Sequence, residues 1–307
     1  MPLTQLNFQP GIDTENTPTG AEGRWIDCDK VRFRKGLPQK IGGWTKFSEA
    51  YYVGVGRALE QWFALDGSRY EALGTDRKVY VYVAGTNQDI TPIRSTDALV
   101  NAISTTTSSN IITITDTDHG AIQGDFVTLS SVSTAVAGIP AATLDAEYQI
   151  LSIANSDAYT IQSSATANAN TGPTANCTIN YQLNIGPSIQ TFGFGWGAGF
   201  WNAGTWNTPR TTSQITLDAR LWSINNWGED LIITQKDGGT YEWDTSAGMT
   251  DNRATVVANA PTTSTLSLVS TETRHVVCMG TETTIGTNTT QDKMFIRWSD
   301  QENYNQW

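Results

Sequence analysis

Short stretches in which apolar and polar residues alternate, separated by Gly, Asp and Asn turns, recur along most of the chain. This pattern is typical of half-buried β-strands joined by tight turns. The clearest group predicts strands at residues 58–65, 70–75 and 78–83, with an Asp66-Gly67 hairpin turn and a closing segment at 87–93. A meander of about 40 residues has the size of one propeller blade.

The same order recurs with strands at 221–224, 230–234 and 240–244, and a partial third copy spans 274–279 and 293–298. The sequence therefore predicts an all-β fold of β-propeller-like blade repeats. Setting aside the first 50 residues and an insertion leaves roughly 170 residues, which is enough for about four blades. The propeller is then small, open or incomplete, or the chain is the N-terminal part of a longer product.

Four regions are predicted: an extended N-terminal arm at 1–50, a first blade at 51–97, an inserted small β domain at 98–183, and further blades at 184–307. The inserted domain contains five strand candidates, whose spacing fits a small antiparallel barrel or sandwich. They are residues 110–115, 124–129, 147–153, 158–161 and 176–181.

Composition narrows the class of protein. Of the 307 residues 38% are hydrophobic and 16% are charged, with 11 tryptophans, which argues against a disordered chain. The formal charge is −11, and residues 95–209 contain seven acidic side chains but neither Lys nor Arg. This balance argues against a protein that coats DNA, although DNA could slide past such a surface without sticking.

Little in the chain suggests catalysis. Cys28, Cys177 and Cys278 lack metal-binding spacing, so three reduced thiols are expected. Residues 116–120 contain two Asp and His119, which fits either a tight turn or a metal or acid–base cluster, and the turn is favoured. His275 lies in an apolar run and is expected to be packed. We therefore expect no enzymatic activity, catalytic residues, metal, cofactor or small-molecule substrate.

A segment at 191–207 alternates glycines with large aromatics and carries no charge. Its aromatics either fold back onto the body of the protein or form an exposed loop, as an adhesive tip or a channel constriction. They are Phe192, Phe194, Trp196, Phe200, Trp201 and Trp206.

Several segments resemble a family of phage virion structural proteins, the tail-nozzle or packaged-DNA stabilisation proteins of short-tailed phages. The resemblance covers the chain except, more weakly, the insertion, which is similar to β modules of other phage structural proteins. Members of the family are generally longer than this chain. The segments are residues 8–12, 22–34, 36–44, 73–75, 89–94, 206–210 and 298–302.

The resemblance implies a homohexameric ring in the virion tail, below the portal and adaptor, made in the cytoplasm of the infected bacterium. Double-stranded DNA would pass its central channel without sequence-specific binding, and tail fibres and the host envelope would be neighbours at the tip. The aromatic loop would then gate the channel. The arm would contact partner proteins through Arg24, Trp25, Arg32, Phe33 and Arg34.

Two other functions stay open. A receptor-binding or glycan-binding tail protein is expected to expose a tryptophan face to a glycan. A capsid decoration protein is expected to bind shells that lack tails.

Overall fold

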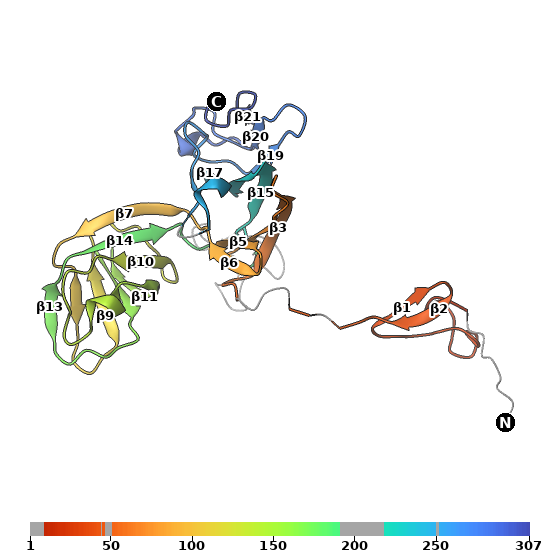
Figure 1. The fold of residues 1–307 in the computed structure, drawn as a ribbon, viewed down its shortest axis with the longest axis horizontal. Coiled ribbons are helices and arrows are strands. Elements are labelled where there is room, and N and C mark those ends of the chain that lie inside the picture. The colour runs from red at the N-terminus through yellow and green to blue at the C-terminus, as the bar shows by residue number, and fades with distance from the viewer. Residues whose placement is uncertain (1–8, 44, 47–50, 191–217, 250–251) are drawn as a thin grey trace, which may run out of the picture. The chain divides into compact units, whose positions relative to one another are not determined.

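Nearly every regular element of the protein is a β-strand, as the alternating pattern predicts (Figure 1). The structure is a computed structural model that describes residues 9–43, 45–46, 51–190, 218–249 and 252–307. The chain divides into two compact units, Met1–Glu49 and Ala50–Trp307, called unit 1 and unit 2 below. The all-β fold class is thereby confirmed.

The described part of unit 1 contains one hairpin, formed by β1 (Val31–Arg34) and β2 (Leu37–Lys40). Its two turn residues, Lys35 and Gly36, both have positive φ, at 52° and 79°. Positive φ at both central residues marks a type I′ turn, whose twist matches that of the paired strands.

Unit 2 begins with a four-stranded antiparallel meander, called blade 1. Its strands are β3 (Gly56–Phe63), β4 (Arg69–Thr75), β5 (Val79–Val83) and β6 (Thr86–Asp89), paired in that order. All three predicted strands of this group are present, each shifted by no more than two residues.

Two further meanders follow later in the chain. Blade 2 consists of β15 (Trp222–Trp227), β16 (Asp230–Gln235), β17 (Thr240–Trp243) and β18 (Thr255–Val256). Blade 3 consists of β19 (Leu266–Val269), β20 (Val276–Met279) and β21 (Ile296–Trp298). The repeat pattern did not predict β18, which has only two residues, or β19, which follows a run of Ala, Asn, Pro and Thr typical of a loop.

The three blades stack through apolar faces. One face of blade 1 shares a core with blade 2, in which the rings of Trp62 and Trp243 lie 6.5 Å apart. The opposite face of blade 2 packs against blade 3 and joins Ile232 to Val276 and Cys278. Strand β15 accordingly contacts both β3 and β19 (Figure 1). Each contact between two blades therefore buries one face of each, and blade 2 is covered on both of its faces.

Between blades 1 and 2 the chain forms an eight-stranded antiparallel sheet, called the inserted domain. The sheet wraps around its own apolar core, and its outermost strands, β13 and β7, do not pair with each other. Its strands are β7 (Ile93–Leu99), β8 (Ile103–Thr105), β9 (Ile111–Thr115), β10 (Phe126–Ser130), β11 (Glu147–Asn155), β12 (Ala158–Gln162), β13 (Thr171–Thr174) and β14 (Cys177–Gln182). A single helical turn, α1 (Ala141–Leu144), precedes β11.

The five predicted strands of this domain are all present, and β7, β8 and β13 are additional. Strand β8 has only three residues. Strand β13 contains Gly172-Pro173, and Gly and Pro within a segment argue against predicting a strand there. Strand β11 carries two register shifts against β12, after Ile150 and after Ile153. Such bulges bend a strand, and β11 is the strand that pairs with β10 on one side and β12 on the other.

Candidate functional site

The arm residues implicated by the resemblance lie on and beside the β1–β2 hairpin of unit 1. Arg24 forms an ion pair with Asp13 at 3.2 Å, and Arg32 Nε donates a hydrogen bond to Gln39 Oε1 at 3.0 Å across the hairpin. The rings of Trp25 and Phe33 lie 6.4 Å apart. Arg34 is exposed at the turn.

The described residues of unit 1 form almost no apolar core. Among its described residues only the hydrophobic side chain of Ala21 is buried, while Leu37 is 70% exposed. Trp25 and Phe33 are half-buried. A segment that buries so little apolar surface gains little stability from packing within itself, so its apolar side chains are available to a partner.

The predicted gate residues fall outside the described part of the chain. They are Phe192, Phe194, Trp196, Phe200, Trp201 and Trp206.

The turn at residues 116–120 is a structural cluster. The hydroxyl of Tyr181 donates to Asp116 Oδ2 at 2.6 Å. Burial, reinforced by the neighbouring Tyr159 and Asp116, raises the pKa of Tyr181 far above its usual value, so the hydroxyl stays a donor. His119 Nδ1 accepts from the Ala121 amide at 3.0 Å, which fits a neutral ring. Within the described residues, no group of three or more His, Cys, Asp or Glu side chains could hold a metal ion.

The three cysteines are free thiols. Burial raises the pKa of Cys177 to about 11, with smaller contributions from Asp116 and Asp145. Burial also raises the pKa of Cys278. Both thiols are therefore protonated near neutral pH and poor nucleophiles. His275, predicted to be packed, is half-buried, and its Nδ1 lies 2.8 Å from the Ser299 carbonyl oxygen.

A charged cluster, called the junction, joins the inserted domain to the blades. Lys78 Nζ lies 2.7 Å from Asp89 Oδ2 and 2.5 Å from Glu147 Oε1, and only 4% of the Lys78 side chain is exposed. Arg253 Nη1 lies 3.2 Å from Asp89 Oδ1, and its Nη2 lies 3.5 Å from Glu147 Oε2. Two cations and two carboxylates thus alternate around one site.

Further contacts complete the junction. Gln182 Nε2 donates to Glu147 Oε2 at 2.6 Å, and the Lys78 ammonium lies 4.2 Å from the centre of the Phe126 ring. Burial opposes ionisation of Asp89, but the charges of Lys78 and Arg253 outweigh it, so its pKa lies below the usual value. The sequence did not reveal this cluster, because Glu147 and Arg253 are far from Lys78 in the chain and no sequence pattern links the three.

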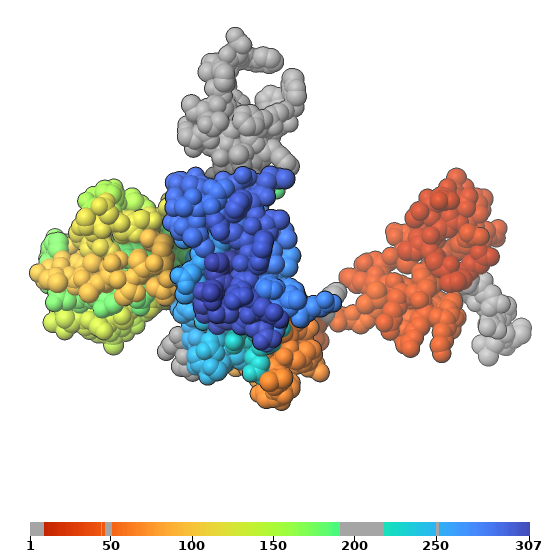
Figure 2. Space-filling model, turned by 90° about the horizontal axis from the view of Figure 1, so that it is seen from above, coloured from red at the N-terminus to blue at the C-terminus, as the bar shows by residue number. Residues whose placement is uncertain are grey.

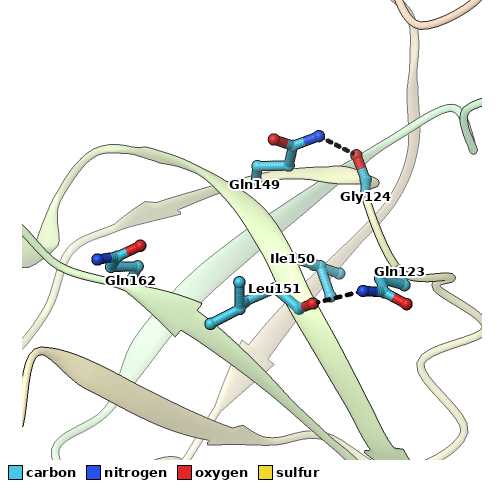
Figure 3. Close-up of a pocket in the computed structure, with 6 residues that line it drawn as sticks. All are labelled: Gln123, Gly124, Gln149, Ile150, Leu151 and Gln162. Atoms are coloured by element: carbon cyan, nitrogen blue, oxygen red, sulfur yellow. Dashed lines mark hydrogen bonds between the residues drawn. The ribbon is translucent and has the colours of Figure 1, made fainter.

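An uncharged depression of about 420 Å³ lies on the inserted domain (Figure 3). Gln149 Nε2 donates to the Gly124 carbonyl and Gln123 Nε2 to the Leu151 carbonyl, both at 3.0 Å. Gln162 lines the same depression. The amide groups and the half-exposed Leu151 suit a neutral polar ligand rather than a charged one.

Blade 3 presents an apolar outer face. Its cross-strand neighbours form two rows across the three strands, and none of the six side chains is polar. One row is Leu266, Met279 and Ile296, and the other is Leu268, Val277 and Trp298. Trp298 is 63% exposed and Ile296 is 49% exposed.

No protein-family model matches the chain, and no curated protein matches it. Among solved structures, Phage phi92 endosialidase aligns with it at 10% sequence identity and a TM-score of 0.25. The alignment covers 79% of this chain but only 37% of that one. So low a score does not establish a common fold, and we infer neither fold nor function from it. In the described part of the chain, no helix is long and apolar enough to cross a membrane.

Proposed function

We propose that the chain is a structural component of a phage tail, forming a ring-shaped nozzle below the portal and adaptor that retains packaged DNA and conducts it during ejection. The observation that carries this proposal is the nearly coreless hairpin of unit 1, which suits a segment that docks on a partner. Residues 22–34 and 36–44, which resemble tail-nozzle proteins, lie in the same unit. The resemblance implies that the partner is the portal–adaptor assembly.

The charge distribution supports passage of DNA rather than capture. A surface rich in carboxylates repels phosphate, so it does not retard a duplex through Coulomb attraction. Residues 95–209, with seven acidic and no basic side chains, would supply such a surface. The full chain should therefore show no retention of double-stranded DNA even at low salt.

The test combines the purified full chain with purified portal and adaptor and images the product by electron microscopy. A ring with a central hole below the adaptor is expected. Replacing Trp25 and Phe33 together by Ser should abolish attachment, because it removes the arm's paired aromatic rings. Replacing Leu151, an exposed residue of the inserted domain, by Ser is the matched control and should not. Failure of the wild-type chain to join the portal–adaptor assembly would refute the proposal.

A second candidate, a glycan-binding tail protein, is favoured by the glutamine-lined depression. Side-chain amides form hydrogen bonds with sugar hydroxyls, and no charge has to be desolvated there. Screening the full chain against a glycan array would test this function. Binding that is lost on replacing Gln149 and Gln162 by Ala, with portal binding absent, would favour the receptor-binding role.

A further inference from the structure

The blade stack has two ends: the outer face of blade 3 is exposed along all three strands, and the outer face of blade 1 is exposed along β3 but covered along β5, where Tyr80 and Tyr82 are buried. Within the chain, contacts always join one face of a blade to the opposite face of the next, as Trp62 of blade 1 meets Trp243 of blade 2. Blade 2 meets blade 3 in the same sense, with Thr240 Oγ1 3.8 Å from Cys278 Sγ. The remaining faces are the outer face of blade 3 and the outer face of blade 1.

The outer face of blade 3 has the composition of an interface core. Its six apolar residues form the two cross-strand rows described above, whereas Ser267 and Cys278 point to the opposite, covered side. The residues toward the C-terminal end of the chain, which include this blade, are blue in Figure 2 and lie toward the viewer. Contiguous apolar patches on a sheet face generally mark contact with another protein surface.

The outer face of blade 1 mixes apolar and polar side chains, and its exposed part is the β3 side. Leu59 is 64% exposed and Phe63 is 60% exposed, and both lie on β3. Leu59 pairs with Leu73 on β4. Gln61 lies between Leu59 and Phe63 on the same face of β3 and pairs with Glu71. Such a mixture of aliphatic, aromatic and polar side chains is typical of the interfaces between separately folded proteins.

We propose that these two faces bind each other between copies of the chain, so that blade 3 of one copy packs on blade 1 of the next. A second copy of the chain is the partner we infer for these faces. Packing blade 3 on blade 1 of that copy would repeat the contacts within the chain, where opposite faces of successive blades meet. Packing of blade 3 on blade 3 would leave Leu59 and Phe63 uncovered. Face-to-opposite-face contacts are heterologous, and they close into a ring when the rotation per copy allows. The inference deepens the proposed nozzle, since it states how the copies of a ring would meet.

The test uses two full-length variants, each defective in one face. Leu268→Glu/Trp298→Glu places charges on blade 3, and Leu59→Glu/Phe63→Glu places them on blade 1. Val100→Glu is the matched control, since Val100 is 73% exposed on the inserted domain. Sedimentation velocity over about a hundredfold range of concentration measures association, and circular dichroism confirms that each variant is folded.

Wild-type protein and the control should form oligomers larger than dimers, and each face variant alone should associate at least about tenfold more weakly. Mixing the two variants should restore association, but only to pairs, because each variant keeps one intact face. Normal self-association of the blade 1 variant would overturn the proposal, as would a wild-type chain that stays monomeric. Attachment of the face variants to the portal and adaptor through unit 1 is measured separately, so failure here is distinguishable from failure of the nozzle proposal.

Discussion

At the scale of single residues, Gly74 allows blade 1 to pack closely against Trp222 of blade 2. A Cβ atom at this position would lie 2.8 Å from Trp222 Cδ1 and 3.1 Å from its Cβ. The indole cannot move away easily, since its Nε1 donates to the buried Thr75 carbonyl at 2.6 Å. We expect Gly74→Ala to lower the free energy of unfolding by roughly 1–3 kcal/mol, as overpacking generally does.

Urea denaturation followed by tryptophan fluorescence measures this change. Gly172→Ala is the control, since nothing lies within 4 Å of the Cβ it would add. Its effect should stay within about 0.5 kcal/mol. An unchanged midpoint for Gly74→Ala would mean that the two blades are less tightly packed than described.

The turn between β5 and β6 contains avoidable backbone strain. Ala84 has φ 48° and Gly85 has φ 82°, the left-handed region that a type I′ turn requires. Asn tolerates this region better than Ala, so Ala84→Asn should stabilise unit 2 by up to about 1 kcal/mol. Gly85→Ala should destabilise it through backbone strain alone, because its added Cβ meets no neighbour. Thermal unfolding of both variants checks the opposite signs.

At the scale of elements, the junction holds the inserted domain to the blades. Lys78→Met removes a buried cation and leaves Asp89 and Glu147 facing each other with only Arg253 to balance them. We expect a loss of about 3 kcal/mol in the free energy of unfolding at pH 7, as for other broken buried pairs. Lys293→Met is the control, since the Lys293 side chain is 58% exposed in its pair with Asp237. That exposed pair should contribute less than about 1 kcal/mol.

The dependence on pH distinguishes this charge effect from simple repacking. The folded-state pKa of Asp89 is lowered, so its stabilising contribution is present above the unfolded value of about 3.9. The contribution is lost as the pH falls through the lower folded value. The difference between wild type and Lys78→Met in urea midpoint should therefore shrink in acid. A difference that persists unchanged at low pH would point to lost packing against Phe126.

The elements also show how far the sequence predicts this structure. Alternation placed β5 within one residue, because Val79–Val83 is both strongly β-forming and bounded by turns. It missed β19, whose Leu266-Ser267-Leu268-Val269 follows a Thr-rich run and is recognisable only by its pairing with β20. The junction was not predictable either, because Lys78 and Glu147 are 69 residues apart and meet only through the fold. The arm residues are predicted contacts that rest on resemblance rather than on spacing.

At the scale of the whole molecule, the two units should differ sharply in stability. The described residues of unit 1 bury little apolar surface, whereas Ile232 on β16 in unit 2 is fully buried. Amides of β1 and β2 should therefore exchange with solvent nearly as fast as in an unfolded peptide, and those of β16 should be protected by at least about a thousandfold. Hydrogen exchange measured by mass spectrometry on the full chain tests this difference. Deleting residues 1–49 should leave the urea midpoint of unit 2 unchanged, because the apolar cores described in unit 2 consist of its own residues. If β1 and β2 were as protected as β16 in the isolated protein, the hairpin would be stable without a partner, and the main physical reason for regarding it as a docking arm would disappear.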